Sequence, residues 1–280
     1  MVEPAAATQQ LGYGPAIFYG LIQGVTEFLP VSSSGHLKLA HRLGLGEMPK
    51  DLELPFDVLL HAATLIAIGI AFRRDIIAAA RRKIPFFVAL GVSVVPAGLA
   101  GLLGRGVVEW FGKAYWTVGI CYVYTAILLF VAQKLGDRFK DVPPPDDPDA
   151  ALESVTLKQA AMVVGFQVFA LLPGVSRSGS TVAAGLMGGM GPVLSVSYSF
   201  LVGLPLIFAA AAKDALDGGF ARLVDAVGPG PLTAAFATSV LSGLVSIWAL
   251  KLVVGKRGLH WFALYCGLVA IACFVAEFAG

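Results

Sequence analysis

Two polar segments interrupt an otherwise apolar sequence, and the first of them carries an acid beside an amide. Gln23 and Glu27 are four residues apart, so on a helix both side chains lie on the same face. Apolar residues flank Glu27 on both sides. An acid at membrane depth costs about 2.5–3.5 kcal/mol on insertion scales, so its presence there indicates a functional site. The alternative is an acid at a helix end whose carboxylate reaches the lipid headgroups.

The same segment continues with three consecutive serines, a glycine and a histidine. These residues are Ser32, Ser33, Ser34, Gly35 and His36. A serine hydroxyl becomes a nucleophile when a neighbouring group accepts its proton. Imidazole titrates near neutrality, so His36 is predicted to carry protons, with a packing role as the alternative.

The second polar segment, residues 173–181, combines one arginine with several hydroxyls and glycines. Its small and polar members are Gly174, Ser176, Ser178, Gly179, Ser180 and Thr181. The planar fork of Arg177 fits two phosphate oxygens and stays charged, and a helix that begins near Ser178 would turn its positive end toward an anion. An arginine that caps a neighbouring helix is the alternative, but it gives no reason for so many hydroxyls. Together the two segments predict phosphoryl chemistry on an amphiphile whose tail stays in lipid.

The composition of the chain is that of a protein largely surrounded by lipid. The 280 residues are 57% hydrophobic and 14% charged, with a mean hydropathy of +0.80, whereas soluble domains carry about 25% charged residues. This composition excludes a nucleic-acid-binding protein, a disordered chain and a cytosolic enzyme, and the net charge of +2 provides no basic field for a polyanion. Cys121, Cys266 and Cys273 lie in apolar runs without motif spacing, so we expect packing residues rather than disulfides or metal ligands.

Six apolar runs are long enough to cross a membrane as helices. A spanning helix needs about 20 apolar residues, because each residue rises 1.5 Å through about 30 Å of hydrocarbon. The runs are Pro55–Phe72, Ile84–Leu103, Ala114–Leu135, Val193–Ala212, Pro231–Val254 and Leu259–Phe278. The predicted fold is therefore an all-α polytopic membrane protein with six transmembrane helices.

Four shorter apolar stretches form two pairs, and one polar segment interrupts each pair. The pairs are Leu11–Pro30 with Gly35–Leu43, and Leu157–Pro173 with Gly179–Gly191. Proline and glycine end helices, and serine competes for backbone hydrogen bonds. Broken backbone is tolerated at membrane depth only inside protein or beside a wet cavity. We expect two re-entrant helix hairpins; two surface loops between cytosolic helices are the alternative.

The two interruptions resemble each other, which indicates an inverted repeat. Residues 31–35 (VSSSG) match residues 175–179 (VSRSG) about half a chain later. The repeat halves would be about 1–136 and 155–280, joined by the proline- and aspartate-rich linker 137–154. Inverted repeats with broken helices typically hold a polar site near the membrane midplane.

Basic residues predict which side of the membrane each connector faces. The connector Arg73–Lys83 carries five basic residues and one acid, so we expect it to be cytoplasmic. Counting spans from there also places the linker 137–154 in the cytoplasm. The first hairpin then enters from the outer side and the second from the cytoplasmic side. The whole chain, 1–280, would form a single integral membrane domain.

Two features of the spans leave alternatives open. Asp57 and His61 share one face at the start of the first span, and they are interpreted either as partners of the site or as a pair at the membrane interface. Small residues such as Ser242 and Gly243 permit close packing between helices or in a homodimer.

At QGVTEFLPVSSSGH (residues 23–36) and PGVSRSGST (residues 173–181), the sequence resembles the undecaprenyl-diphosphate phosphatase family of bacteria, the bacitracin-resistance type. The resemblance runs nearly end to end. It implies an integral hydrolase of the bacterial cytoplasmic (inner) membrane that removes the terminal phosphate of undecaprenyl diphosphate, a polyprenyl diphosphate lipid. The site would open to the outer, periplasmic side and use a divalent cation, Mg²⁺ or Ca²⁺. The monophosphate would be the recycled lipid carrier for cell-wall synthesis, and the activity would confer bacitracin resistance.

The resemblance also implies roles for individual residues. Ser33 matches the proposed nucleophile, His36 the motif histidine and Arg177 the phosphate-binding arginine. Glu27 is the second acid of the (E/Q)xxxE metal-binding motif, and Gln23 fills its first position. The substrate would be bound by Ser32, Ser34, Gly35, Gly174, Ser176, Ser178, Gly179, Ser180 and Thr181. Because the amide of Gln23 adds no charge, we expect weak metal binding or a cation held largely by the diphosphate.

A transporter or lipid flippase is the alternative function, because inverted repeats with broken helices also describe carriers. Glu27 and His36 would then relay protons, and Arg177 would bind the translocated anion. A purely structural scaffold would leave the acid and the arginine unexplained.

Overall fold

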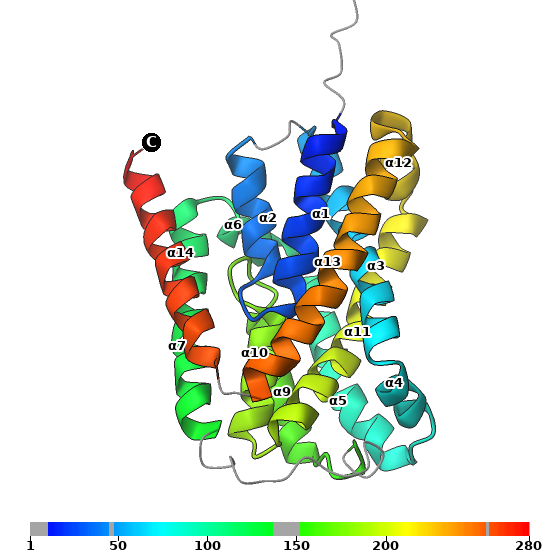
Figure 1. Ribbon diagram of the computed structural model, residues 1–280, viewed down its shortest axis with the longest axis vertical. Helices are drawn as coiled ribbons and strands as arrows, with labels where there is room; N and C mark the ends of the chain where they lie inside the picture. Colours follow the sequence, from blue (N-terminus) through cyan, green and yellow to red (C-terminus); the bar gives the residue numbers. More distant parts are fainter. Residues whose placement is uncertain (1–10, 45–47, 137–151, 256–257, 280) are drawn as a thin grey trace, which may run out of the picture.

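The computed structural model describes residues 11–44, 48–136, 152–255 and 258–279, and helices are the only regular secondary structure in them. These helices form one elongated bundle (Figure 1). They are α1 (Tyr13–Phe28), α2 (Ser33–Arg42), α3 (Lys50–Ala71), α4 (Arg73–Ala80), α5 (Ile84–Leu103), α6 (Arg105–Phe111), α7 (Tyr115–Gly136), α9 (Leu157–Phe169), α10 (Arg177–Met187), α11 (Pro192–Leu216), α12 (Gly219–Val227), α13 (Pro229–Gly255) and α14 (Leu259–Ala279).

Six of these helices are long and apolar enough to cross a membrane: α3, α5, α7, α11, α13 and α14. They coincide with the six predicted runs, so the predicted all-α, multi-pass architecture is confirmed. The largest difference is at α3, which begins at Lys50 rather than at Pro55. Its first turn contains Asp51 and Glu53, which lower the hydropathy of the sequence there but are favoured by the helix dipole.

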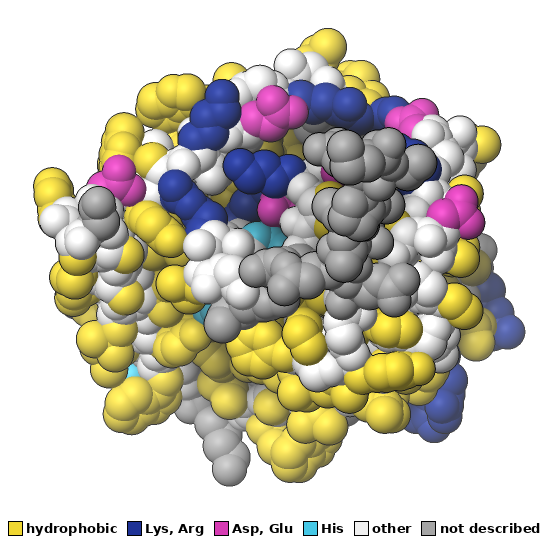
Figure 2. Space-filling model, turned by 90° about the horizontal axis from the view of Figure 1, so that it is seen from above, with side chains coloured by type: hydrophobic (Ala, Val, Ile, Leu, Met, Phe, Trp, Pro, Cys, Tyr) yellow, Lys and Arg dark blue, Asp and Glu magenta, His cyan; other side chains and the backbone are white. Residues whose placement is uncertain are grey.

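Large apolar side chains cover the outside of the bundle, and Figure 2 shows many of them around its rim. On α14 they recur every three or four residues, at Leu264, Leu268, Ile271 and Val275, and each is more than half exposed. In water such a stripe would need a partner. Here it is the surface expected of a helix that faces lipid.

Two pairs of shorter helices lie inside this frame. Figure 1 shows α1 and α2 running from one end of the bundle to its middle, whereas α9 and α10 fill the opposite half. The breaks between the helices of each pair meet about halfway. These are the two interrupted pairs predicted from the sequence, while their depth in a bilayer and the inverted repeat stay predictions. The predicted linker 137–154 lies outside the described residues except for 152–154.

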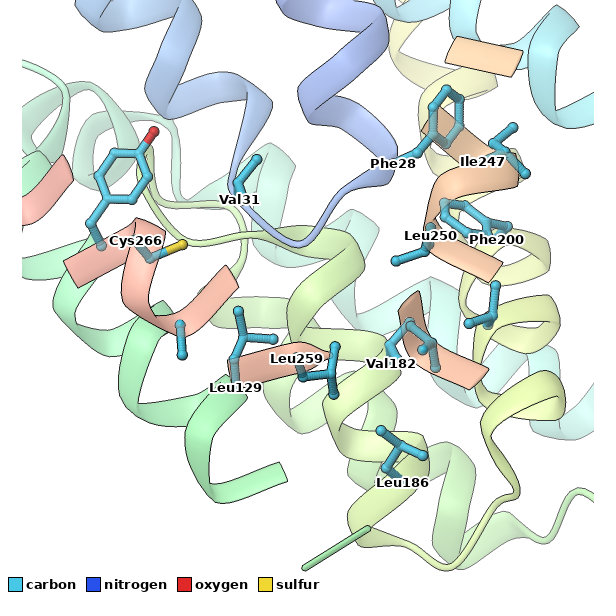
Figure 3. Close-up of a cluster of buried hydrophobic side chains, with 14 of the residues drawn as sticks. Phe28, Val31, Leu129, Val182, Leu186, Phe200, Ile247, Leu250, Leu259 and Cys266 are labelled. Atoms are coloured by element: carbon cyan, nitrogen blue, oxygen red, sulfur yellow. The ribbon is translucent and has the colours of Figure 1, made fainter. Parts of the chain in front are cut away.

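The main apolar core encloses the two breaks (Figure 3). Phe28 and Val31 flank the first break and are buried, as is Val182 just after the second. Phe200 on α11 packs against Phe28, with ring centroids 5.5 Å apart. The broken backbone is therefore surrounded by protein, as it must be where water is scarce. The three cysteines, Cys121, Cys266 and Cys273, are buried, as expected of packing residues.

A close contact between α1 and α13 fixes the first helix pair in place. At Gly24 a methyl group would overlap the carbonyl of Ser239 and the hydroxyl of Ser242, and it would lie 2.8 Å from the nitrogen of Gly243. Small residues let two helix backbones approach this closely, which is a common device in membrane helices. The contact bears directly on the site, because Gly24 lies between Gln23 and Glu27.

Candidate active site

The two breaks are hydrogen-bonded to each other. The hydroxyl of Ser32 accepts from the backbone nitrogen of Gly174 at 3.2 Å and lies 3.3 Å from the carbonyl of Val175. In return, the hydroxyl of Ser178 donates to the carbonyl of Leu29 at 3.2 Å. Each break thus supplies partners for backbone groups of the other, and segments about 145 residues apart in sequence become one structure.

Each break also supplies the N-cap residue of the helix that follows it. Ser32 caps α2 by accepting from the nitrogen of Gly35 at 3.3 Å, and Ser176 caps α10 by accepting from the nitrogen of Gly179 at 3.0 Å. Serine is a favoured residue at this position because its hydroxyl satisfies a free N–H group. Ser32 has a φ of 66°, which is unusual for a residue other than glycine and indicates backbone strain held by the surroundings.

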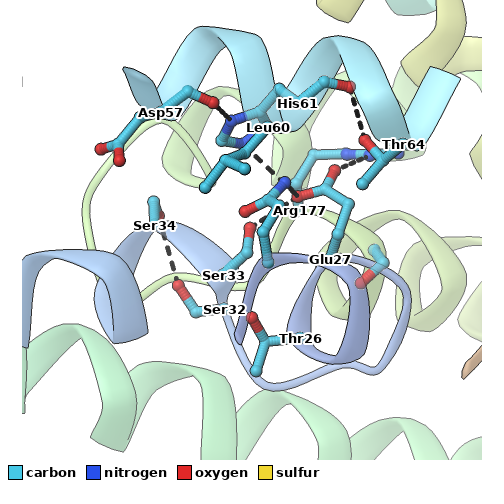
Figure 4. A network of polar contacts seen from close by, with 12 residues as sticks. Thr26, Glu27, Ser32, Ser33, Ser34, Asp57, Leu60, His61, Thr64 and Arg177 are labelled. Atoms are coloured by element: carbon cyan, nitrogen blue, oxygen red, sulfur yellow. Dashed lines mark hydrogen bonds and ion pairs between the residues drawn. The ribbon is translucent and has the colours of Figure 1, made fainter. Parts of the chain in front are cut away.

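Glu27 lies at the centre of the site (Figure 4). Its Oε2 atom accepts from the hydroxyl of Ser33 at 2.6 Å and from the amide of Gln23 at 3.2 Å. Its Oε1 atom is 2.5 Å from Nη2 of Arg177, the first residue of α10. The structure therefore brings together the predicted acid, the predicted nucleophile and the predicted anion-binding arginine. Only 5% of the Glu27 side chain is exposed, so an ionised carboxylate there needs these donors.

His61 also contacts Glu27, which decides between the two interpretations of Asp57 and His61. The Nε2 atom of His61 is 3.5 Å from Oε2 of Glu27, and its Nδ1 atom is 2.6 Å from the backbone carbonyl of Asp57. A carbonyl only accepts, so Nδ1 carries a proton and Nε2 is the nitrogen that faces the carboxylate. The side chain of Asp57 pairs with His41 at 3.0 Å. His61 thus contacts the site, whereas Asp57 contributes only its backbone carbonyl, which bonds the ring of His61.

His36 has different neighbours. Its Nδ1 atom lies 2.8 Å from the carbonyl of Ser32 and 2.8 Å from the hydroxyl of Tyr122, and its Nε2 atom lies 2.7 Å from the hydroxyl of Tyr265. Both ring nitrogens are therefore engaged with residues other than Glu27. The predicted role of His36 in proton transfer stays a prediction, because these contacts link α2 to α7 and α14 without reaching the acid.

Most of the predicted phosphate-binding hydroxyls already have partners within the protein. Ser32, Ser176 and Ser178 bond to backbone groups as described, Ser34 lies 3.4 Å from the hydroxyl of Ser32, and Thr181 bonds to Ser199 on α11. Ser180 is buried without a hydrogen-bond partner among the described residues, and so is Nη1 of Arg177.

The predicted glycines lie where the backbone leaves little or no space for a side chain. Gly174 has a φ of 99°, and a side chain there would lie 2.6 Å from the carbonyl of Val118. Gly35 and Gly179 face Tyr122 and Pro30 with little space for a side chain.

The site fits a divalent cation only if the substrate supplies some of the ligands. In the described ranges, no group of three or more histidine, cysteine, aspartate or glutamate side chains could hold a metal ion. The Oε1 atom of Gln23 is nevertheless buried without a hydrogen-bond partner, and the same amide touches Glu27. One carboxylate and one free amide oxygen are the kind of incomplete set that Mg²⁺ uses when a phosphate completes its shell.

One face of the molecule has a hollow with charged side chains around it. Figure 2, seen from the end at which α1 begins, shows Lys and Arg side chains around a hollow in which acidic and histidine side chains are visible. The side chain of His61 is 27% exposed, whereas that of Glu27 is 5% exposed. The arrangement can bind an anionic group, activate a hydroxyl and exclude most water.

The sequence is similar throughout to proteins of one family. The family model described as "Bacitracin resistance protein BacA" matches residues 16–272. A protein named undecaprenyl-diphosphatase from Christiangramia forsetii is 34% identical over 275 residues, which cover 94% of this chain and 98% of that protein. Proteins of the same name from Halothermothrix orenii and Methanobrevibacter smithii are 36% and 32% identical. They match 91% and 94% of this chain, and 94% and 96% of their own lengths.

Proposed function

The chain belongs to the bacitracin resistance protein BacA family, and from this membership we propose that it hydrolyses undecaprenyl diphosphate to undecaprenyl phosphate and inorganic phosphate. The observation that carries the proposal is the contact of Glu27 with both Ser33 and Arg177 where the two breaks meet. A base, a hydroxyl and a guanidinium within one buried cluster are what transfer of a phosphoryl group requires.

Ser33 attacks the terminal phosphorus while Glu27 accepts the proton of its hydroxyl. An oxygen–phosphorus bond forms to Ser33 as the bridging phosphorus–oxygen bond breaks, and the lipid monophosphate leaves. Water then attacks the phosphoserine: a new oxygen–phosphorus bond forms to the water as the bond to Ser33 breaks. Inorganic phosphate leaves with the protons of the water, and Glu27 returns its proton to the oxygen of Ser33. The support for Glu27 as the base is its distance of 2.6 Å from the serine hydroxyl, well within the range needed for proton transfer.

Arg177 binds the oxygens of the transferring phosphoryl group. Its Nη2 atom contacts Glu27. Its Nη1 atom has no hydrogen-bond partner among the described residues but is buried against Gly203 of α11, so the guanidinium must shift when it binds the phosphoryl oxygens. Most of the acceleration in phosphoryl transfer comes from such positioning and charge stabilisation. Attack by water that His36 activates is the alternative route, and a trapped phosphoseryl intermediate would separate the two.

A divalent cation, Mg²⁺ or Ca²⁺, is part of the proposal. Glu27 and Gln23 would hold it together with the diphosphate, and its charge would neutralise the phosphate oxygens. The free amide oxygen of Gln23 is the support for this assignment. Ser33 and Arg177 keep their roles as nucleophile and phosphate ligand.

We place the reaction at the outer face of the bacterial cytoplasmic membrane, with the polyprenyl tail between helices. In support, the basic connector containing α4 lies at the end opposite to the hollow of Figure 2, so the positive-inside rule orients the hollow outward. The product would re-enter cell-wall synthesis as lipid carrier, and faster recycling of the diphosphate would confer bacitracin resistance.

Phosphate release by the purified protein tests the proposal. Detergent-solubilised protein incubated with undecaprenyl diphosphate should release inorganic phosphate in proportion to enzyme and time. Hydrolysis needs no sealed compartment, whereas vectorial transport does, so the same assay separates the phosphatase from a flippase. Absence of phosphate release, together with lipid movement in sealed vesicles, would support the transporter instead.

A further inference from the structure

A threonine in the middle of α7 holds the segment that leads into Arg177. Thr125 is buried, and its hydroxyl donates to the carbonyl of Gly174 at 3.0 Å, with the carbonyl of Cys121 on its own helix as a second acceptor at 3.1 Å. The same oxygen accepts from the backbone nitrogen of Ser176 at 3.1 Å. One side chain on a spanning helix is thus hydrogen-bonded to two peptide groups of the second break.

The hydroxyls of Thr125 and Ser32 together satisfy the backbone of this segment. Ser32 accepts from the nitrogen of Gly174 and lies 3.3 Å from the carbonyl of Val175. Thr125 supplies the partners of the Gly174 carbonyl and the Ser176 nitrogen. These peptide groups are buried where neither a regular helix nor bulk water can supply a hydrogen-bond partner. An unpaired buried group costs about 1–3 kcal/mol. Each hydroxyl therefore fixes the path of the chain.

The held segment ends one residue before the arginine of the site. Ser176 caps α10, and Arg177 is the first residue of that helix. The position of the guanidinium relative to Glu27 depends on where α10 begins, and this is set by the peptide groups that Thr125 and Ser32 hold. A displacement of about 1 Å at a reacting group can lower a rate about 100-fold.

We propose that Thr125 is a positioning residue for Arg177: its hydroxyl fixes Gly174–Ser176 so that the guanidinium meets Glu27 and the phosphoryl group. This inference rests on the proposed phosphatase function. Thr125 touches neither Glu27 nor Ser33 among its hydrogen bonds in the described chain, so it acts through the backbone of the second break.

The test compares Thr125→Val, which keeps the shape and removes the hydroxyl, with Thr125→Ser, which keeps the hydroxyl. Thr117→Val is the matched control, because Thr117 lies on the same helix, is equally buried and bonds only to carbonyls near its own end of α7. Phosphate release from farnesyl diphosphate and undecaprenyl diphosphate gives kcat and KM for each purified protein. Thermal unfolding in the same detergent measures stability.

We expect Thr125→Val to lower kcat by about 10- to 100-fold. Its melting temperature should fall because two buried peptide groups lose their partner, but it should stay above the assay temperature, so that the kcat loss is measured on folded protein. Thr125→Ser should recover most of the lost kcat. In an Arg177→Lys background, Thr125→Val should cause little further loss, because the arginine whose position it sets is already absent. A kcat within twofold of the wild type for Thr125→Val would overturn the inference, as would an equal loss in Thr117→Val.

The two proposals fail in different ways. If the wild-type protein releases no phosphate from either diphosphate, the proposed function is wrong. If the wild type is active and Thr125→Val is equally active, only the positioning role is wrong. Should Thr125→Val not purify as folded protein, Thr125→Ser and Thr125→Cys keep a polar group at the position. Because a hydroxyl forms stronger hydrogen bonds than a thiol, Thr125→Ser should then have a higher kcat than Thr125→Cys. Equal kcat values of the two variants would contradict the inference.

Discussion

The carboxylate of Glu27 and the guanidinium of Arg177 lie 2.5 Å apart, although 150 residues separate them in the sequence. One belongs to the end of α1 and the other to the start of α10, so this ion pair joins the two broken helix pairs at the centre of the molecule. Each charge would be costly there alone. Paired, the two charges offset part of that cost, and the other oxygen of the carboxylate still accepts from the hydroxyl of Ser33.

Replacement of Arg177 should remove most activity. We expect Arg177→Ala to lower kcat/KM by about 1,000-fold, in the range of losses seen when a donor to transition-state charge is removed. Arg177→Lys keeps the charge but loses the planar fork, so it should recover only part of this loss. The measurement is phosphate release by purified protein, with Arg74→Ala in the basic connector as the control. Turnover by Arg177→Ala close to that of the wild type would remove the arginine from the mechanism.

Replacement of Ser33 should separate the two chemical routes. If Ser33 is the nucleophile, Ser33→Ala loses activity by about 1,000-fold or more, because the hydroxyl that Glu27 activates is gone. Rapid quenching of the wild type should then trap phosphate on Ser33. Ser246→Ala is a suitable control, since that buried serine bonds only within its own helix, to the carbonyl of Ser242. An active Ser33→Ala variant without a phosphoenzyme in the wild type would favour direct attack by water.

Removal of the His61 side chain should weaken the site moderately. His61 faces Glu27 at 3.5 Å, and we expect His61→Ala to lower kcat/KM about tenfold, the effect of ~1.4 kcal/mol. His61→Gln places an amide donor at the same position, so it should lose less. His260→Ala, which removes a ring that contacts Trp261 at a tilt of 42°, controls for loss of a histidine elsewhere. Equal activity of His61→Ala and the wild type would show that the contact with Glu27 contributes nothing.

The fold was predictable because a helix that spans a membrane requires an apolar run of about 20 residues, which is visible in the sequence. All six spans follow from apolar runs, and the interruptions follow from proline, glycine and serine in stretches too short to span. The pairing of Glu27 with Arg177 was predictable in outline, since two buried opposite charges in matching segments need each other.

The remaining parts of the site depend on packing that the sequence does not display. His36 follows the serines directly, but the first turn of α2 points its ring at Tyr122 and Tyr265. His61 reaches Glu27 because α3 packs beside α1, and its same-face pairing with Asp57 was the only signal. Thr125 gave no signal that distinguished it from Thr117 on the same helix.

The close contact between α1 and α13 should make Gly24 sensitive to substitution. In Gly24→Ala the methyl group would overlap the backbone and side chains of α13, so the two helices must separate and the melting temperature in detergent should fall. Gly69→Ala is the matched control. Gly69 lies within the spanning helix α3, and nothing lies within 4 Å of the added atom. There alanine should be neutral or stabilising by up to about 1 kcal/mol. A melting temperature of Gly24→Ala that equals that of Gly69→Ala would show that α1 and α13 pack less tightly than the structure has them.

The free amide oxygen of Gln23 makes metal dependence the most direct test of the cation. Removal of divalent cations with EDTA should abolish phosphate release, and Mg²⁺ or Ca²⁺ should restore it. In Gln23→Glu a second carboxylate adds charge beside Glu27, so we expect the half-activating concentration of Mg²⁺ to fall about tenfold, or ~1.4 kcal/mol in metal affinity. Gln23→Leu, which offers no ligand, should raise it.

Gln159→Glu provides the control for this measurement, because Gln159 belongs to the capping box of α9, which glutamate also forms, and only its bond to the carbonyl of Gly188 is lost. Its half-activating concentration should match that of the wild type. Full activity of the wild type after chelation would refute the cation itself. Equal half-activating concentrations in the wild type, Gln23→Glu and Gln23→Leu would instead leave the cation in place and remove Gln23 from its ligands, so that Glu27 and the diphosphate would have to hold it alone.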